Sequence, residues 1–203
     1  MRLGAVLLAG SLGCAHVYDF DATPRNACAG DPVTVTWKAD GKVSLDAQPP
    51  VPGIGPKADQ GSESFVIARD TRFVLHARAL LSSAHAEKDI VVAPPTLEYG
   101  TFADCSSDSR AIVSSFEVKE VSPAVKLKGV VNVNARDIAI QPEGAGTPEV
   151  AVPASGRSES FQGQRAGGRW TVKSALGPGE TCQDALRRVA RKLVMKLEID
   201  CGR

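Results

Sequence analysis

The stretch Gly30-Asp31-Pro32-Val33-Thr34-Val35-Thr36-Trp37 carries the clearest structural signal in the sequence. Val33, Val35 and Trp37 alternate with two threonines, so an extended chain places the apolar side chains on one face and the hydroxyl groups on the other. Glycine, aspartate and proline precede the alternation and Gly41 follows it, and these residues favour turns. The stretch therefore predicts a half-buried β-strand between two turns.

Segments on both sides of this strand have the same character. They are short apolar runs separated by turn residues, and the chain contains 19 Gly and 13 Pro. Short strands divided by Gly and Pro are the pattern of a β-sandwich. Residues 49–61 lack the pattern and predict a mobile loop. Further strands are predicted at residues 17–20, 43–45, 64–67, 73–77 and 90–92.

Residues 17–93 resemble the small immunoglobulin-like domains of bacterial envelope proteins. In that family a Gly-Asp-x-Val-Thr-Val-Thr-Trp strand is followed by a turn and a Thr-x-Tyr-x-Leu-x-Ala strand. The segment from Thr71 to Ala77 stands in the second place here, with Phe73 where the family often has Tyr, so the hydroxyl of the corner hydrogen bond is lost. The resemblance implies an immunoglobulin-like β-sandwich and says almost nothing about function.

Bulk composition limits the organisation and the partners of the chain. A length of 203 residues is enough for two domains, which we expect, and 43% hydrophobic residues can fill two cores. Lys and Arg number 24 against 23 Asp and Glu, so the net charge of +1 provides no field for nucleic acid, and we predict no nucleic-acid partner. Aromatic residues make up only 5%, which leaves few rings for sugar binding.

The second domain is predicted at residues 96–203, after the stiff joint Pro94-Pro95. It matches no family that we recognise, and its pattern is β-rich. In the segment 125–133 we expect Val125, Leu127, Val131 and Val133 on one face and Lys126, Lys128 and Asn132 on the other. Other strands are predicted at residues 111–118, 136–140, 149–152 and 169–172.

The C-terminal region departs from the pure β pattern. Thr181 with Asp184 resembles a capping box, and apolar residues follow at helical spacing, so we predict a helix at residues 182–191. Beyond it, apolar and charged residues alternate from Leu193 to Cys201, which favours a strand. A continuous helix to Leu197 fits nearly as well.

Residues 1–13 have the character of an export signal. Met1 and Arg2 give a minimal basic start, and residues 3–12 form an apolar run interrupted only by Gly and Ser. The run is shorter than the roughly 20 residues that span a bilayer, but it suits the apolar core of a signal peptide. We therefore predict a signal peptide at residues 1–13 and an exported protein.

The segment Ser11-Leu12-Gly13-Cys14 resembles the lipobox of bacterial lipoproteins, although its Leu stands one place later than in the family. In that family the Cys is diacylated on sulfur, becomes the first residue after cleavage and is acylated again on its amine. The resemblance implies fatty-acyl chains such as palmitate on Cys14, with residues 14–16 as anchor and tether. The alternative is an ordinary signal peptide, cleaved after Ala15, in which Cys14 has no role.

The other four cysteines predict disulfides, because export exposes them to an oxidising compartment. Four cysteines permit three pairings. Cys28 has no second cysteine within residues 17–93, and the immunoglobulin-like resemblance implies that its loop lies near Cys105. We therefore expect Cys28 to pair with Cys105 and Cys182 with Cys201. The rival pairing joins Cys28 to Cys201 and Cys105 to Cys182.

Motifs for catalysis or metal binding are absent from the sequence. His16, His76 and His85 are scattered, and no His-Glu-x-x-His, Cys-x-x-Cys, Gly-x-Ser-x-Gly or phosphate-binding loop occurs. We therefore predict no catalytic residue, no metal and no cofactor. Asp104 and Asp108 offer oxygens of the kind that calcium prefers, but a polar turn is the simpler interpretation.

A basic group at the C-terminal helix is a candidate contact for anionic lipid or cell-wall polymer, although a solvated helix face is the simpler interpretation. Its members are Arg187, Arg188, Arg191 and Lys192.

Together these observations predict a non-enzymatic lipoprotein of the cell envelope that acts as an interaction or structural module. Ala15 is not the Asp that retains enterobacterial lipoproteins at the inner membrane, so the resemblance implies the outer membrane, on its periplasmic or surface side. The expected partners are the membrane, through the lipid anchor, and envelope proteins or cell-wall polymer. The alternatives are a soluble periplasmic binding or accessory protein, and an exported hydrolase with His76 or His85 beside a carboxylate and a nucleophile.

Overall fold

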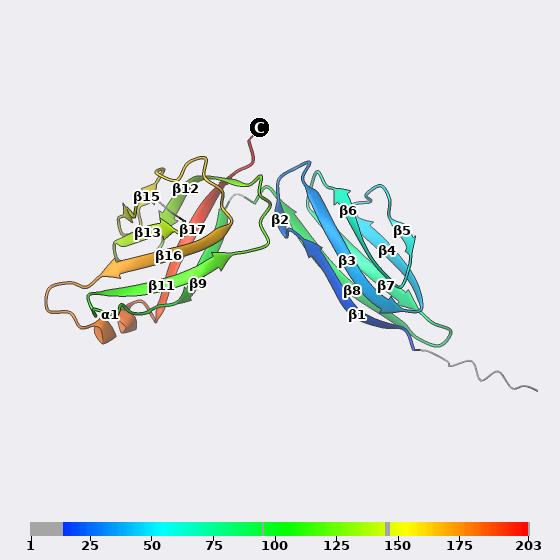
Figure 1. The fold of residues 1–203 in the computed structure, drawn as a ribbon, viewed down its shortest axis with the longest axis horizontal. Coiled ribbons are helices and arrows are strands. Elements are labelled where there is room, and N and C mark those ends of the chain that lie inside the picture. The colour runs from blue at the N-terminus through cyan, green and yellow to red at the C-terminus, as the bar shows by residue number, and fades with distance from the viewer. Residues whose placement is uncertain (1–13, 95, 145–146, 203) are drawn as a thin grey trace, which may run out of the picture. The chain divides into compact units, whose positions relative to one another are not determined.

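The computed structural model describes residues 14–94, 96–144 and 147–202, so the predicted signal peptide at residues 1–13 lies outside the described residues. The chain is mainly β, with several sheets and one C-terminal helix, as the sequence predicts (Figure 1). It divides into two compact units. Among the described residues, unit 1 contains those up to Thr23 together with Pro32–Ile90, and unit 2 contains Pro24–Asp31 together with those from Val91 onward. Residues 24–31, which we placed in the first domain, therefore belong with the second.

Unit 1 consists of two antiparallel sheets. The first has the order β1-β3-β6, formed by β1 (His16–Thr23), β3 (Pro32–Asp40) and β6 (Gln60–Val66). In the second, β7 (Thr71–Arg78) lies between β4 (Lys42–Gln48) and β8 (Ser83–Val92), and β5 (Gly55–Lys57) forms the edge beside β4. This order is compatible with the immunoglobulin-like sandwich that the sequence predicts.

The core of unit 1 forms between these two sheets. Val33, Val35 and Trp37 of β3 are buried, as their alternation predicts, and the Trp37 indole N–H donates to the carbonyl of Ala58 at 2.9 Å. Rings from the two sheets meet where Phe65 packs against Phe73, with centroids 5.5 Å apart. Apolar contact across two facing sheets is therefore what stabilises this unit.

The predicted mobile loop at residues 49–61 is wrong in part. Residues 55–57 form β5, which pairs with β4, and Gln60 and Gly61 begin β6. Gly61 lies opposite Trp37 in the β3–β6 register, and a Cβ atom at Gly61 would stand 2.4 Å from the indole ring. The absence of a side chain lets the indole lie over this strand, an interaction that single-strand periodicity does not reveal.

Unit 2 also contains two sheets, shown at the left of Figure 1. One has the order β15-β12-β17-β9, and the other the order β10-β11-β16-β13-β14. Within this unit, β2 (Asn26–Ala27) pairs in parallel with Val91 and Val92. The remaining strands are β9 (Thr96–Phe102), β10 (Asp104–Cys105), β11 (Ala111–Val118), β12 (Lys126–Asn132), β13 (Ile138–Pro142), β14 (Val150–Val152), β15 (Arg157–Ser158), β16 (Gly168–Ala175) and β17 (Lys192–Asp200).

The core of unit 2 contains side chains from both sheets and from the helix. Trp170 of β16 is 1% exposed and meets Phe161 edge to face, with centroids 5.4 Å apart. Leu193 and Met195 of β17 are fully buried in the same cluster. Trp170 is therefore a core residue, as the sequence predicts.

The predicted facing of β12 holds through Lys128, which is exposed, and is wrong from Val131 onward. A register shift between Leu127 and Gly129 marks a bulge, and a bulge reverses the alternation that follows it. Asn132, which we expected on the outer face, is fully buried, while Val133, which we expected inside, is 41% exposed.

The helix α1 (Cys182–Arg188) begins where the sequence predicts and ends three residues earlier than residue 191. Thr181 caps it, since its Oγ1 accepts from the N–H of Asp184 at 3.2 Å. Ala190 and Arg191 then take positive φ values of 49° and 58°, which turn the chain out of the helix and into β17. Helix followed by strand is confirmed, and the continuous helix is wrong. Within the part of the chain that the structure describes, no helix is long and apolar enough to cross a membrane.

Candidate functional site

Cys14 lies directly ahead of the first strand of unit 1, with an exposed side chain. It is the one cysteine of the five in the sequence that forms no disulfide. The residue after it is fixed, because Ala15 is only 9% exposed and its N–H donates to the Oγ of Ser82 at 2.6 Å. The Cys14 side chain is therefore open to solvent, while the backbone beside it is bound to the fold.

A small polar cluster follows Cys14 on β1. Tyr18 donates its hydroxyl hydrogen to the carboxylate of Asp40, and this hydrogen bond, followed by the negative charge of Asp40, raises the pKa of Tyr18. His16 meets the Tyr18 ring edge on, at 4.6 Å between centroids, and the Lys38 ammonium lies 6.0 Å from the ring centroid. These contacts hold the exposed edge of β1 in place.

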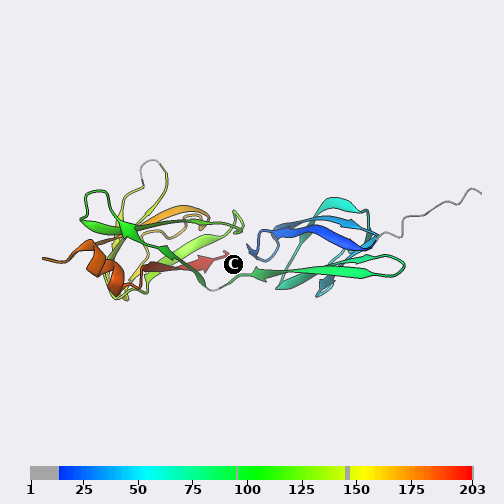
Figure 2. The ribbon, with the colours of Figure 1, turned by 90° about the horizontal axis from the view of Figure 1, so that it is seen from below.

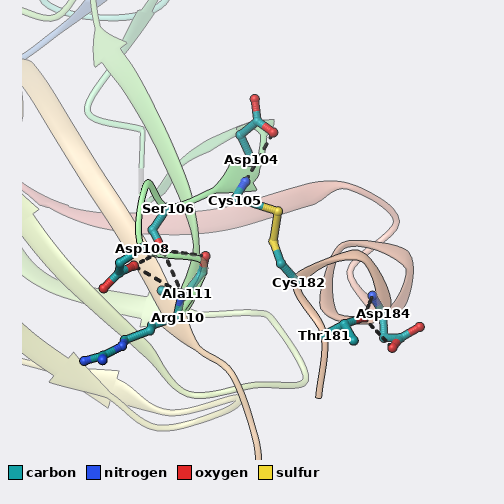
Figure 3. Close-up of a disulfide and its surroundings, with 9 residues drawn as sticks. All are labelled: Asp104, Cys105, Ser106, Asp108, Arg110, Ala111, Thr181, Cys182 and Asp184. Carbon is teal, nitrogen blue, oxygen red and sulfur yellow. Dashed lines mark hydrogen bonds between the residues drawn. A yellow bond between two sulfur atoms is a disulfide. The ribbon is translucent and has the colours of Figure 1, made fainter. Parts of the chain in front are cut away.

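The four predicted disulfide cysteines do form two disulfides, but the pairing that we favoured is wrong. Cys28 pairs with Cys201 and Cys105 with Cys182, which is the rival arrangement. Figure 3 shows the second bond joining β10 to the first residue of α1, next to the Thr181–Asp184 cap.

The path of the chain after the helix excludes the favoured pairing. The nine residues of β17 extend at about 3.3 Å each, so Cys201 lies about 30 Å from the start of the strand. A disulfide allows about 7 Å between α-carbons, so Cys182 at the other end cannot reach it. Cys28 reaches Cys201 because its segment belongs to unit 2, where the N–H of Asn26 donates to the carbonyl of Glu120 at 2.9 Å.

The predicted basic group is not one continuous surface. Arg187 pairs with Asp184 at 3.7 Å, and Arg188 pairs with Glu180 at 3.3 Å, so part of their charge is compensated. Arg188 and Lys192 line a cleft of about 490 Å³ in unit 2, whereas Arg187 and Arg191 do not. The structure therefore brings two of the four residues together.

The ion pair between Arg136 and Glu180 lies at this cleft. Two nitrogens of Arg136 donate to the two carboxylate oxygens at 2.7 and 2.8 Å, and Arg136 also donates to the carbonyl of Ala175 at 2.7 Å. The hydrogen bonds from Arg136, then the N–H of Gly177, and the charges of Arg136 and Arg188 lower the pKa of Glu180 to about 2. The same pair raises the pKa of Arg136, so both groups stay charged across the physiological range.

Two buried asparagines support the turn that carries Arg136. The side-chain amide of Asn132 donates to the carbonyl of Arg136 at 2.7 Å, and its oxygen accepts from the N–H of Asn134 at 2.9 Å. Asn134 in turn donates to the carbonyl of Val194 and accepts from its N–H, at 2.7 and 3.0 Å. The network fixes the turn beside β17, because buried amides are costly unless they are hydrogen-bonded.

Sequence reasoning missed these polar residues. Asn132, Asn134 and Arg136 occupy alternate positions, and that spacing was the available signal for one polar face. The apolar pattern predicts a solvent-facing Asn132, because the pattern does not show the bulge that precedes this residue. Glu180 stands in a Gly-Pro-Gly turn, where a carboxylate has no expected partner.

The three histidines lie on strands of unit 1, two of them on neighbouring strands. His76 lies 3.2 Å from the carboxylate of Asp46, and Ser44 is opposite His76 on the neighbouring strand; all three line a cleft of about 530 Å³ in unit 1. Among the described residues no hydrogen bond joins the Ser44 hydroxyl to the His76 imidazole, the contact through which a base activates a serine. His85 faces His76 at 6.5 Å between centroids, and His16 lies on β1.

Asp104 and Asp108 hold their own turn. Asp104 accepts from the N–H of Cys105 at 3.2 Å, and Asp108 accepts from the Ser106 hydroxyl at 2.7 Å and from the N–H of Arg110 at 3.1 Å (Figure 3). The bond from Ser106 is the main cause that lowers the pKa of Asp108. No group of three or more potential metal ligands occurs among the residues with described positions.

Fold and site together define a disulfide-bonded, mainly β protein of two compact units with one accessible cysteine ahead of its first strand. No protein-family model and no curated protein matches the chain.

Proposed function

We propose that the protein is a non-enzymatic lipoprotein of the bacterial cell envelope, anchored through Cys14 and presenting its β-rich units as interaction or structural modules. One observation carries the proposal: four cysteines are joined in disulfides while Cys14 remains exposed and single. In an oxidising compartment, an exposed unpaired thiol is open to unwanted intermolecular pairing. A thioether bond to lipid removes that thiol and accounts for a cysteine that has no disulfide partner.

The anchor would hold the protein firmly. Each buried CH₂ group contributes about 0.8 kcal/mol to membrane binding, and a single acyl chain gives only marginal binding, so several chains are needed for a stable anchor. The family that the lipobox resembles attaches three chains to its cysteine.

The outer membrane is the proposed location, since Ala15 follows Cys14 in place of an inner-membrane Asp. Two disulfides support export from the cytoplasm. The proposed partners are envelope proteins or cell-wall polymer, for which Arg188 and Lys192 at the unit 2 cleft are the best placed of the basic residues.

Replacement of Cys14 by Ser tests the proposal. We expect the wild-type protein to sediment with membranes, to begin at Cys14 and to carry the mass of its acyl chains, and the Cys14→Ser variant to lose the acyl mass and the membrane association. The matched control is Ser82→Ala, which removes the hydrogen bond to Ala15 but keeps Cys14, and should remain on the membrane. Fractionation and intact-protein mass spectrometry provide the readouts.

A wild-type protein without acyl mass in the soluble periplasmic fraction would contradict the anchor and favour the soluble accessory protein. An exported hydrolase would instead turn over an ester or amide substrate, and His76→Ala would abolish the turnover.

A further inference from the structure

The turn between β7 and β8 exposes two adjacent leucines. Leu80 is 84% exposed and Leu81 is 82% exposed, the two highest values among the large hydrophobic side chains that the structure describes. The turn itself is closed by backbone, since the N–H of Ala79 donates to the carbonyl of Ser82 at 2.9 Å. Turns usually carry Gly, Asn, Asp, Ser or Pro, so the fold of unit 1 does not require leucine here.

This turn lies beside the residue that carries the proposed anchor. The N–H of Ala15, the neighbour of Cys14, donates to the Oγ of Ser82 in the turn at 2.6 Å. The start of β1 and the β7–β8 turn lie at the same end of unit 1 in both Figure 1 and Figure 2. Acyl chains on Cys14 would therefore enter a bilayer next to Leu80 and Leu81.

Basic side chains stand behind the leucines. Arg78 ends β7, and Lys42 begins β4 directly opposite it in the register. Both are exposed, and neither forms an ion pair within the described part of the chain. The carboxylate of Asp40, at the end of β3, accepts a hydrogen bond from the Tyr18 hydroxyl. Apolar residues at a tip with cations behind them match the layering of a lipid surface, where acyl chains lie below anionic headgroups.

We propose that the β7–β8 turn is a membrane-inserting tip: Leu80 and Leu81 enter the leaflet that holds the acyl chains of Cys14, and Lys42 and Arg78 meet its phosphates. The proposal rests on the lipid anchor of the proposed function. It adds that this end of unit 1 is bound to the lipid surface instead of swinging freely on a tether. Burial of two leucines adds to the attraction that the anchor supplies.

Tryptophan at the tip tests the insertion in the purified, full-length protein reconstituted into vesicles of zwitterionic and anionic phospholipid. The variant Leu81→Trp should show blue-shifted emission and a loss of intensity when the lipids carry bromine on their acyl chains. The matched control is Val66→Trp. Val66 is 65% exposed in the same unit, and it pairs with Pro32 at the end of β3 opposite to Asp40, so its emission should not respond to brominated lipid. Trp37 and Trp170 are buried and give the background signal.

Intact mass separates the two proposals. If Cys14 is acylated and the Leu81→Trp signal matches that of Val66→Trp, the inserting tip is wrong and the lipid anchor stands. If no acyl mass is found, the anchor is wrong; the tip then stands only if the same vesicles, added to the unacylated protein, still shift and quench Leu81→Trp, and it falls if they do not.

Discussion

The carboxylate of Glu180 contacts residues from three separate segments of unit 2. It accepts from Arg136, from the N–H of Gly177, and lies 3.3 Å from a nitrogen of Arg188. These partners favour the charged form, which lowers its pKa from 4.5 to about 2. A carboxylate whose pKa is lower in the folded than in the unfolded protein stabilises the fold fully while it is ionised in both states, and this stabilisation declines to zero as the pH falls through the folded-state pKa.

The stability of unit 2 should therefore depend on Glu180 in acid. Stabilisation by its charge is fully present above about pH 4.5 and is lost as the pH falls toward about 2. We expect Glu180→Gln to lower the urea midpoint at neutral pH and to flatten the fall between about pH 5 and about pH 2. Denaturation followed at several pH values measures both effects.

The matched control for that experiment is Glu98→Gln. Glu98 forms an exposed ion pair with Lys196 at 3.2 Å, and exposed pairs contribute little. It should keep the wild-type acid profile. Identical acid profiles for Glu180→Gln and the wild type would contradict the role of the Arg136 pair.

Sequence alone did not reveal the Arg136–Glu180 pair, because its members are 44 positions apart and belong to different turns. Cys14 differs, since its signal is local: an apolar run with a cysteine after it. Local chemistry can be read from neighbouring residues, whereas a long-range ion pair requires the fold to be known first.

The contact between β3 and β6 depends on a size match between side chains on the two strands. Trp37 is 5% exposed, and its indole passes over Gly61, where a Cβ atom would stand 2.4 Å from the ring. The hydrogen bond from the indole to the carbonyl of Ala58 keeps the ring from moving aside. The pair therefore has little room for an added methyl group.

We expect Gly61→Ala to destabilise unit 1 by about 1–3 kcal/mol through overpacking. Ser62→Ala, at the exposed neighbouring position in the same strand, should change stability by less than about 0.5 kcal/mol. Denaturant unfolding followed by Trp37 fluorescence measures the difference. Equal stability of the two variants would show that the ring can shift without cost.

Alternation of apolar and polar residues correctly predicts the strands in which it runs without a break. Val33 to Trp37 and Leu193 to Ile199 are buried at the positions that the pattern predicts, because a strand facing one core must alternate. The pattern failed at β12, where a bulge reverses the faces, and at β5, whose residues are rich in turn formers. The helix ends before the predicted residue 191 because Ala190 and Arg191 adopt a left-handed backbone. Neither residue type favours that conformation, so the sequence does not predict it.

Both disulfides belong to unit 2. They span 173 and 77 positions of sequence. Cross-links of this kind stabilise mainly by restricting the unfolded chain, and the effect grows slowly with the length of the closed loop. Each unit also contains one of the two tryptophans, Trp37 in unit 1 and Trp170 in unit 2.

We expect removal of either disulfide to destabilise unit 2 by about 2–5 kcal/mol. The loss should be larger for Cys28→Ala with Cys201→Ala than for Cys105→Ala with Cys182→Ala, by about 0.7 kcal/mol from the loop lengths. A Trp37→Phe background leaves Trp170 as the single reporter, so its unfolding midpoint measures unit 2 alone. An unchanged midpoint in either double variant would contradict the stabilising role of that bond.

The four disulfide cysteines were predicted from export, but their partners were not. Our pairing assumed that Cys28 follows the strands around it, whereas residues 24–31 pack with unit 2. The spacing of cysteines does not show that a segment packs with another unit, since disulfide connectivity depends on the complete path of the chain.

The position of β17 has a consequence for synthesis and for the proposed export. This strand lies between β12 and β9, so the sheet has no centre until residue 200 has been made. Ribosomes and export channels both deliver the polypeptide from its N-terminus, and β9 and β12 must wait through most of unit 2 for their common neighbour. During that interval their open edges invite pairing with other nascent chains. If the chain is exported as proposed, a chaperone that shields β9 and β12 would therefore matter most in the moments before β17 emerges.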